Sequence, residues 1–486
     1  MSYLEFLHLV APETMVAMTA LAVLAIGLTK SRISGFCSGV AAAGLLFAIA
    51  AVLELPSRAM LFHGMLVISP LNSLFKVVCL TLALFTVLLA RSERALPNKG
   101  EYFSLILLAT IGLLLLVGSE ELLMIFIGLE LTGLSLYILV AFDKNDQRGA
   151  EAALKYFLFG SMASAFTLFG LSWIYGVAGT TSLAGIGAEV SGQTLPPLLF
   201  AGMVMALIGF AFKIAAAPFH LWAPDAYEAA PIPSAAFIAS GSKVASFLVL
   251  GKIVLLGFRP LAGSANWHAM MAGWVPVLAV LSAFSILLGN LVALAQKNVR
   301  RLLAYSAVAH AGYTLLGLVA AGREGFAATL FYTTIYAFTL LGAFGVAGIV
   351  RRETGGDDLA NFTGLRARSP LLAGAMAVFL LSLAGLPPLA GFFGKFYLFS
   401  SALRSGPDHG LLWLVVLALF GSLVSLYYYL IVLRVIFTNP AERSEELFPL
   451  RMEVLPGISI GLLAAIVLFL GIAPSFLLAP ILAALP

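Results

Sequence analysis

Residues 209–247 read GFAFKIAAAPFHLWAPDAYEAAPIPSAAFIASGSKVASF. The stretch is apolar apart from isolated charges, and Lys213 and Lys243 each lie deep inside an apolar run. Pro218 lacks a backbone donor and clashes with the preceding helical turn, so it should interrupt the helix that carries Lys213. The stretch therefore predicts two apolar helices, the first of them broken, with a lysine near the centre of each.

The whole chain is as apolar as this stretch. Of its 486 residues, 61% are hydrophobic and 10% are charged, whereas a soluble domain carries about 25% charged residues. Lipid permits only helices or closed barrels, and barrel strands alternate polar and apolar residues. Here the apolar runs are continuous and roughly 20 residues long, which is the length of a spanning helix. We therefore predict an all-α, polytopic membrane protein.

The apolar runs predict about fourteen transmembrane helices. They lie near residues 11–29, 34–53, 70–90, 103–118, 121–141, 151–176, 198–221, 229–256, 272–295, 300–320, 326–349, 370–400, 410–436 and 455–478. A polar loop with Pro440 occupies 437–454, before the last span.

A second proline-rich break lies in the twelfth span, where LAGLPPLAGFFGKFY (383–397) surrounds Lys395. Interrupted helices at corresponding positions of two halves point to an ion path in inverted-repeat transporters. The two breaks, near 218 and near 387, are five spans apart, so the second runs through the membrane in the opposite direction. We predict three N-terminal helices in 1–100, a first five-helix repeat in 101–256, an inverted second repeat in 270–437, and a loop with a final helix in 438–486.

The lysines and arginines predict the orientation of the chain. If the N-terminus faces outward, 17 of these 27 residues lie in inward loops, 4 lie in outward loops and the other six lie inside spans. Basic loops remain on the cytoplasmic side of a membrane. We therefore predict that both termini lie on the outer, periplasmic side. The net charge of +4 reflects these loops and predicts no nucleic-acid partner.

The sequence contains no motif for a redox cofactor or a nucleotide. CxxC, clustered His and Cys, GxGxxG and Walker-type loops are all missing from it, and Cys37 and Cys79 fit no metal spacing. We predict that this chain itself binds no cofactor and no metal.

Charged residues within the spans are the candidate functional residues. A charge at mid-bilayer costs at least ~2.5–3.5 kcal/mol on insertion scales, so each one needs an explanation. Glu130 lies near the centre of the fifth span and Lys155 lies near the inner end of the sixth, so the two would meet if these spans pack together. We interpret Glu130 as a titratable site rather than a structural ion pair. For Lys155, the alternative is a side chain that reaches the inner surface.

Lys213, Lys243 and Lys395 form the centre of a predicted proton path. Lysine suits this task because burial brings its charged and neutral forms close in free energy, which arginine does not allow. Lys395, beside the second break, fits a terminal station of the path. Lys76 and Lys252 lie near the outer ends of their spans, and we expect them to reach the outer surface instead.

Two histidines are further candidates for the path. His220 follows the first break, and His310 lies in the tenth span, at depths that suit a bridge between Lys243 and Lys395. Imidazole titrates near neutral pH; the alternative is a hydrogen-bonded core histidine. Asp225 and Glu228 follow the first break, and we expect a solvated loop there, with proton attraction as the alternative.

Five segments together resemble subunit N of bacterial NADH:quinone oxidoreductase, the complex I family. They are FIGLELTGLSLYILVAF (126–142), GAEAALKYFLFGSMASAF (149–166), the stretch 209–247, LVALAQKNVRRLLAYSAVAHAGY (291–313) and LSLAGLPPLAGFFGKFY (381–397). KxxxxPFHLW-type segments also occur in the sister subunits L and M, which resemble cation/proton antiporter subunits. A lysine at position 395 together with AALKYF favours N over M.

The resemblance implies an antiporter-like fold of fourteen helices, with proton-path roles for Glu130, Lys155, Lys213, Lys243 and Lys395. It also implies a place in the membrane arm of respiratory complex I, in the bacterial inner membrane, beside subunits M, L, K, J and A. NADH, FMN, iron–sulfur clusters and quinone are then expected on other subunits, including those of the peripheral arm.

We therefore expect a translocase subunit that moves protons rather than electrons, coupled to quinone reduction elsewhere in the complex. One alternative is a cation/proton antiporter subunit, which has the same fold and similar lysines. Another is a membrane subunit of a related hydrogenase or ferredoxin-linked complex. A scaffold without a proton path would not explain several lysines at mid-membrane depth.

Overall fold

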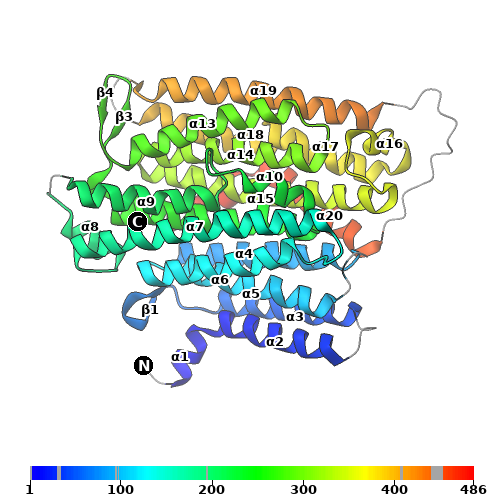
Figure 1. Ribbon diagram of the computed structural model, residues 1–486, viewed down its shortest axis with the longest axis horizontal. Coiled ribbons are helices and arrows are strands. Elements are labelled where there is room, and N and C mark those ends of the chain that lie inside the picture. The colour runs from blue at the N-terminus through cyan, green and yellow to red at the C-terminus, as the bar shows by residue number, and fades with distance from the viewer. Residues whose placement is uncertain are drawn as a thin grey trace.

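The fold is a bundle of long, nearly parallel helices. The computed structural model describes residues 3–29, 34–93, 96, 98–192, 195–405, 409–438 and 453–485. Figure 1 shows the helices side by side, with α2 and α3 at one edge of the bundle and α19 at the opposite edge. Within the described residues, 12 helices are long and apolar enough to cross a membrane. The predicted all-α, polytopic class is confirmed.

Eleven of these spans are single α-helices at the expected positions. They are α2 (Ala11–Thr29), α3 (Ser34–Leu53), α4 (Pro70–Ala90), α5 (Lys99–Gly118), α6 (Leu122–Val140), α7 (Gln147–Ala178), α13 (Trp274–Leu294), α14 (Val299–Val319), α15 (Arg323–Thr354), α19 (Leu412–Phe437) and α20 (Val454–Ile472). The helices α7 and α15 continue past their apolar runs into polar residues, so both are longer than hydropathy alone predicts.

Spans seven and twelve are interrupted, as the prolines predict. The helix α9 (Pro197–Lys213) ends before the break and α10 (Trp222–Ala229) follows it; α17 (Pro370–Ala384) and α18 (Ala390–Arg404) flank the second break. Each break contains a cis proline peptide bond, Ala217–Pro218 in the first and Pro387–Pro388 in the second. None of these half-helices is among the 12 spans. The 12 and the two interrupted spans together match the expected fourteen.

Span eight carries an irregularity that sequence reasoning missed. It divides at Ser240 into α11 (Ile232–Ala239) and α12 (Gly241–Lys252), and it ends in a π-helical turn, η2 (Ile253–Gly257). The Ser240 hydroxyl donates to the Ala236 carbonyl one turn earlier, a contact that bends helices. The division lies three residues before Lys243, so it sets the direction in which that lysine leaves its helix.

Short elements cap the bundle at both ends. Two hairpins, β1 (Ala59–Leu61) with β2 (Leu66–Ile68) and β3 (Ser264–Asn266) with β4 (Ala269–Met271), lie at the same end as α1 (Tyr3–Leu9) and α8 (Leu183–Glu189). The short α16 (Leu365–Arg368) lies at the other end, and α21 (Ser475–Ala484) follows the last span. The remaining short turns are η1 (Phe62–Gly64), η3 (Arg259–Leu261) and η4 (Leu359–Phe362). Of the predicted loop 437–454, residues 439–452 lie outside the described residues.

The centre of the bundle is formed by spans eight, ten and eleven. In Ile232–Gly257, α14 and α15, 94% of the residues in the most apolar 18-residue stretch are buried, whereas the corresponding share in α19 is 39%. Exposed leucines and phenylalanines cover the outer helices, including Phe157 on α7 and Leu423 on α19. Such a surface suits lipid or other apolar helices, while polar groups on the central helices are isolated from both.

Candidate proton-translocation site

The site begins at Glu130, in the middle of α6. Its Oε1 accepts a hydrogen bond from the hydroxyl of Ser164, which lies on the neighbouring helix α7. Glu130 and Ser164 line a cavity of about 10 Å³ together with Thr167 and Lys213. This volume is close to what one water molecule occupies. The cavity therefore brings the carboxylate of α6 and the ammonium of α9 into one polar site.

Lys213 is the last residue of α9, directly before the first break. Its Nζ donates to the carbonyl of Leu129 at 3.3 Å and lies 5.6 Å from the centre of the Tyr137 ring. Gly133 provides the space for this ammonium, because a Cβ built at Gly133 would lie 2.6 Å from Nζ. Within the described residues, no carboxylate lies within salt-bridge distance of Lys213, although it interacts electrostatically with Glu130.

Lys155 does not approach Glu130, which corrects the expected pairing. Its Nζ lies 2.8 Å from Glu151 and 2.8 Å from Asp225, and its side chain is 42% exposed. The helices α6 and α7 do pack together, but the α7 residue that reaches Glu130 is Ser164, more than two turns beyond Lys155. Lys155 therefore belongs to a separate ion-pair network near one end of the bundle.

Asp225 and Glu228 organise that network, so the expectation of a solvated loop was wrong. Both lie in α10, and their side chains are 26% and 32% exposed. Arg301 contacts the two carboxylates at 2.9 Å and 2.7 Å, and Asp225 also contacts Lys155. Asp225 thus links α7, α10 and α14 in one ionic contact.

Arg300 fixes the junction after α10. Its guanidinium is fully buried, donates to the carbonyls of Tyr227 and Ala230, and forms an ion pair with Asp357 at 3.3 Å. Charged groups are rarely buried this completely unless paired. Arg300 therefore holds the second half of the broken span against α14.

Lys243 lies in the first turn of α12 and is 1% exposed. Its Nζ donates to the carbonyl of Ala307 at 2.7 Å and lies 5.4 Å from the centre of the Tyr336 ring. Both partners are neutral and belong to the central helices α14 and α15. As with Lys213, no ion pair to Lys243 exists among the described side chains.

His310 lies in α14, where its ring centre is 5.0 Å from that of Tyr336 and 5.6 Å from that of Tyr313, the two rings that Lys243 and Lys395 approach. One ring nitrogen, Nδ1, is 2.6 Å from the Tyr332 hydroxyl, and Nε2 is 3.1 Å from the Tyr429 hydroxyl. The Tyr429 hydroxyl also contacts Ser306. The histidine is therefore bracketed by two hydroxyl groups that each donate or accept a hydrogen bond.

Lys395 lies one turn into α18 and is 4% exposed. Its Nζ donates to the carbonyl of Ala384, which ends α17, and to the hydroxyl of Ser422 on α19. The ammonium also lies 5.1 Å from the centre of the Tyr313 ring. In a continuous helix the Ala384 carbonyl would accept a backbone hydrogen bond. Because α17 ends there, this carbonyl is free to accept a hydrogen bond from Lys395.

His220 lies beside Tyr305, in the segment between the first break and α10. It is 7% exposed, in the segment after the first break, and its ring centre is 6.4 Å from that of Tyr305. The guanidinium of Arg301 lies 5.9 Å from the centre of the same Tyr305 ring. Nδ1 of His220 has no hydrogen-bond partner among the described residues. His220 therefore lies on the side of the Arg301–Asp225 network.

Lys76 and Lys252 do not reach the surface, which corrects the expectation for both. Their side chains are 5% and 3% exposed. Lys76 lies 2.6 Å from Glu13, and Lys252 lies 3.3 Å from Glu120. The acidic partners come from helix ends that are distant in sequence, and no local pattern marks them.

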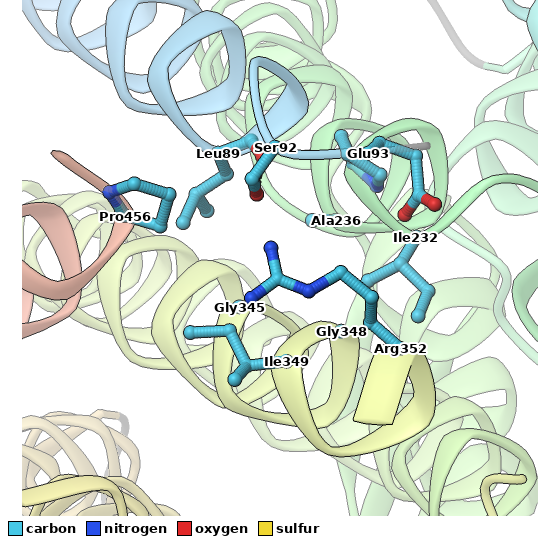
Figure 2. Close-up of a pocket in the computed structure, with 11 residues that line it drawn as sticks. Leu89, Ser92, Glu93, Ile232, Ala236, Gly345, Gly348, Ile349, Arg352 and Pro456 are labelled. Carbon is cyan, nitrogen blue, oxygen red and sulfur yellow. Dashed lines mark hydrogen bonds between the residues drawn. The ribbon is translucent and has the colours of Figure 1, made fainter. Parts of the chain in front are cut away.

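The cavity in Figure 2 lies elsewhere in the bundle. Figure 2 shows Arg352 of α15 directed between Leu89, Ile349 and Pro456, in a space of about 20 Å³. None of the predicted proton-path residues lines it. It is a packing gap between α4, α11, α15 and α20.

Known proteins resemble this chain over its whole length. The family described as NADH:quinone oxidoreductase/Mrp antiporter, TM, matches residues 119–424. NADH-quinone oxidoreductase subunit N 2 of Acidobacterium capsulatum is 46% identical, covering 98% of each chain. The subunit N of Moorella thermoacetica is 40% identical, covering 96% of each chain.

Solved structures agree with these relatives. A chain of respiratory complex I from Thermus thermophilus superposes with a TM-score of 0.80 at 33% identity, covering 96% of this chain and 98% of that one. A chain of the Mrp complex from Dietzia superposes with a TM-score of 0.82 at 22% identity, covering 98% of this chain and 96% of that one, so that similarity concerns the fold alone.

The fold and the buried lysines define an antiporter-like membrane subunit. The chain belongs to the NADH:quinone oxidoreductase/Mrp antiporter family and, within it, to the subunit N group of NADH-quinone oxidoreductases.

Proposed function

We propose that this chain translocates protons in the inner membrane of a bacterium, as a membrane-arm subunit of a respiratory complex I. Its two ends would face the periplasm, and subunits M, L, K, J and A with the peripheral arm would be its partners. NADH, FMN, iron–sulfur clusters and quinone would be held by those other subunits. Within the described residues, no group of three His, Cys, Asp or Glu side chains could hold a metal ion.

One observation supports this proposal most directly. Lys243 and Lys395 are buried in the bundle and Lys213 is half-buried, and each of the three donates only to carbonyl or hydroxyl oxygens. An ammonium buried without a carboxylate is costly, so the neutral form of such a lysine competes with the charged form. Lysines in this state can accept and release protons at little free-energy cost, as a relay requires.

The path would run from the Glu130 cavity to Lys213, then to Lys243, His310 and Lys395. Glu130 and Lys213 share a cavity, and His310 packs against Tyr336 and Tyr313, the rings that Lys243 and Lys395 approach. Quinone reduction elsewhere in the complex would change the charges around Glu130 and Lys155. That change would alter the proton occupancy of Lys213 and pass along the two predicted repeats, 101–256 and 270–437.

The test replaces Lys213 with methionine in the assembled complex. Lys213→Met should reduce NADH-driven proton uptake into inverted membrane vesicles by at least roughly tenfold, because it removes a positioned proton carrier. Lys144→Met is the matched control, because Lys144 is exposed in the loop between α6 and α7. Unchanged uptake with Lys213→Met would contradict the proposal.

Purification distinguishes the proposal from the alternative of an antiporter subunit. The chain extracted from its native membrane should co-purify with NADH dehydrogenase subunits. Co-purification with other antiporter subunits alone, and sodium-driven proton exchange without NADH, would favour the alternative.

A further inference from the structure

A second buried ionic cluster lies outside the proposed path. It consists of Glu13 in the first turn of α2, Lys76 of α4, Lys252 at the end of α12, and Glu120 between α5 and α6. We call it the end cluster. It lies at the end of the bundle that carries α1 and the hairpins, opposite the Lys155–Asp225–Arg301 network.

The two lysines of the end cluster surround one short turn of backbone. Lys252 Nζ donates to the carbonyls of Val117 and Ser119 at 3.0 Å and 3.4 Å. Lys76 lies on the other side, because a Cβ built at Gly118 would be 3.7 Å from its Nζ. The two ammonium groups therefore form one site rather than two separate ion pairs.

Asn72 joins the two halves of the end cluster. Lys252 Nζ donates to Asn72 Oδ1 at 2.6 Å, and Asn72 lies one turn before Lys76 on α4. The cluster thus connects α2 and α4, two of the three N-terminal helices, to α12, the helix that also carries Lys243. Lys252 lies nine residues after Lys243, which is roughly 14 Å along the helix.

Glu120 is the most exposed member of the end cluster, and the other three residues are nearly or fully buried. The side chain of Glu13 is 10% exposed and that of Glu120 is 31% exposed, with the two lysines at 5% and 3%. Oε2 of Glu13 is buried and has no hydrogen-bond partner among the described residues. A buried carboxylate oxygen without a donor is costly unless it binds a proton or a water molecule. Glu120 therefore connects a deeply buried titratable site to water.

We propose that Glu13, Lys76, Lys252 and Glu120 form a proton-exchange site, where protons pass between this chain and the water on the side that Glu120 faces. The inference rests on the proposed proton path, because it supplies that path with an opening at this end of the bundle. In the exchange, a proton moves from the Lys252 ammonium to a Glu120 oxygen, breaking an N–H bond and forming an O–H bond. Glu120 then releases the proton to water.

The alternative is that the end cluster only clamps the N-terminal helices to α12. The two roles differ in what a double replacement does. Removing one partner of a buried pair leaves an unpaired charge, whereas removing both is often harmless to stability. A clamp should therefore recover when Lys252→Met is combined with Glu120→Gln. A proton-exchange site should not recover.

The experiment uses the assembled complex in inverted membrane vesicles. The amount of complex, NADH-driven quinone reduction and proton uptake are measured for Lys252→Met, Glu120→Gln and the double variant. Arg404→Gln combined with Glu324→Gln is the matched control, because this ion pair is exposed at the same end of the bundle. We expect the double variant to assemble but to lose roughly tenfold in proton uptake, as for other positioned proton carriers.

Two results would overturn the inference. In the first, the double variant takes up protons at the rate of the control. In the second, the complex fails to assemble even with both charges removed, which would assign the end cluster a purely structural role. Lys213→Met in the same vesicles separates this failure from that of the path itself, because it should reduce uptake whether or not the end cluster exchanges protons.

Discussion

The ammonium of Lys213 occupies the space that a side chain at Gly133 would need. A Cβ built at Gly133 lies 2.6 Å from Lys213 Nζ and 3.2 Å from the Tyr137 hydroxyl. Gly133 lies on α6, one turn after Glu130. Because Gly133 has no side chain, the ammonium of Lys213 at the end of α9 can pack against α6.

Gly133→Ala should displace Lys213 from its site. Overpacking a well-packed interior typically costs about 1–3 kcal/mol, and here the atom that must move is the proton carrier. We expect NADH-driven proton uptake to fall by roughly tenfold, with the amount of assembled complex retained. Gly374→Ala is the control, since a Cβ there meets nothing within 4 Å. Equal uptake by the two variants would count against this role of Gly133.

Asp225→Asn should weaken the ionic contact between the first and second predicted repeats. Asp225 contacts both Lys155 and Arg301, whereas Glu228 contacts Arg301 alone. Half-exposed pairs are individually weak, so we expect coupled quinone reduction to fall roughly fivefold for Asp225→Asn and less for Glu228→Gln. The measurement is the rate of NADH-driven quinone reduction in sealed vesicles. A larger loss for Glu228→Gln would show that the bridge to Lys155 is unimportant.

Tyr332→Phe should interrupt transfer between Lys243 and Lys395. The substitution keeps the ring stacked on His310 but removes the hydroxyl that lies 2.6 Å from Nδ1. We expect proton uptake to fall roughly tenfold, as for other lost proton-transfer partners. Tyr175→Phe is the control, because Tyr175 is 52% exposed on the outer surface of α7. If both variants pump equally, His310 does not transfer protons through Tyr332.

The sequence was sufficient to predict the positions of the spans and of both breaks. Continuous apolar runs have the length of a spanning helix, and Pro218 and the Pro387–Pro388 pair disrupt helical hydrogen bonding wherever they occur. The depths of Lys213, Lys243 and Lys395 followed from the same spans. The positions of the spans, the breaks and the buried lysines depend only on residues that are close together in the chain. They can therefore be predicted from a single sequence.

The partners of these residues could not be predicted from the sequence. Glu130 bonds to Ser164 and not to Lys155 because the register of α6 against α7 is set by packing, not by either helix alone. Lys252 meets Asn72, which is 180 residues earlier. The division of span eight at Ser240 could not be predicted either, because a serine in an apolar helix usually bonds to a carbonyl of its own helix without dividing it.

The most direct test of a lysine relay is proton uptake by the complex that carries Lys243→Arg. Arginine keeps the positive charge but does not release its proton in proteins. If Lys243 carries protons, Lys243→Arg should lose NADH-driven uptake as completely as Lys243→Met, while Lys144→Arg pumps normally. Uptake by Lys243→Arg at the unmodified rate would show that this position needs only a charge, and would contradict the relay.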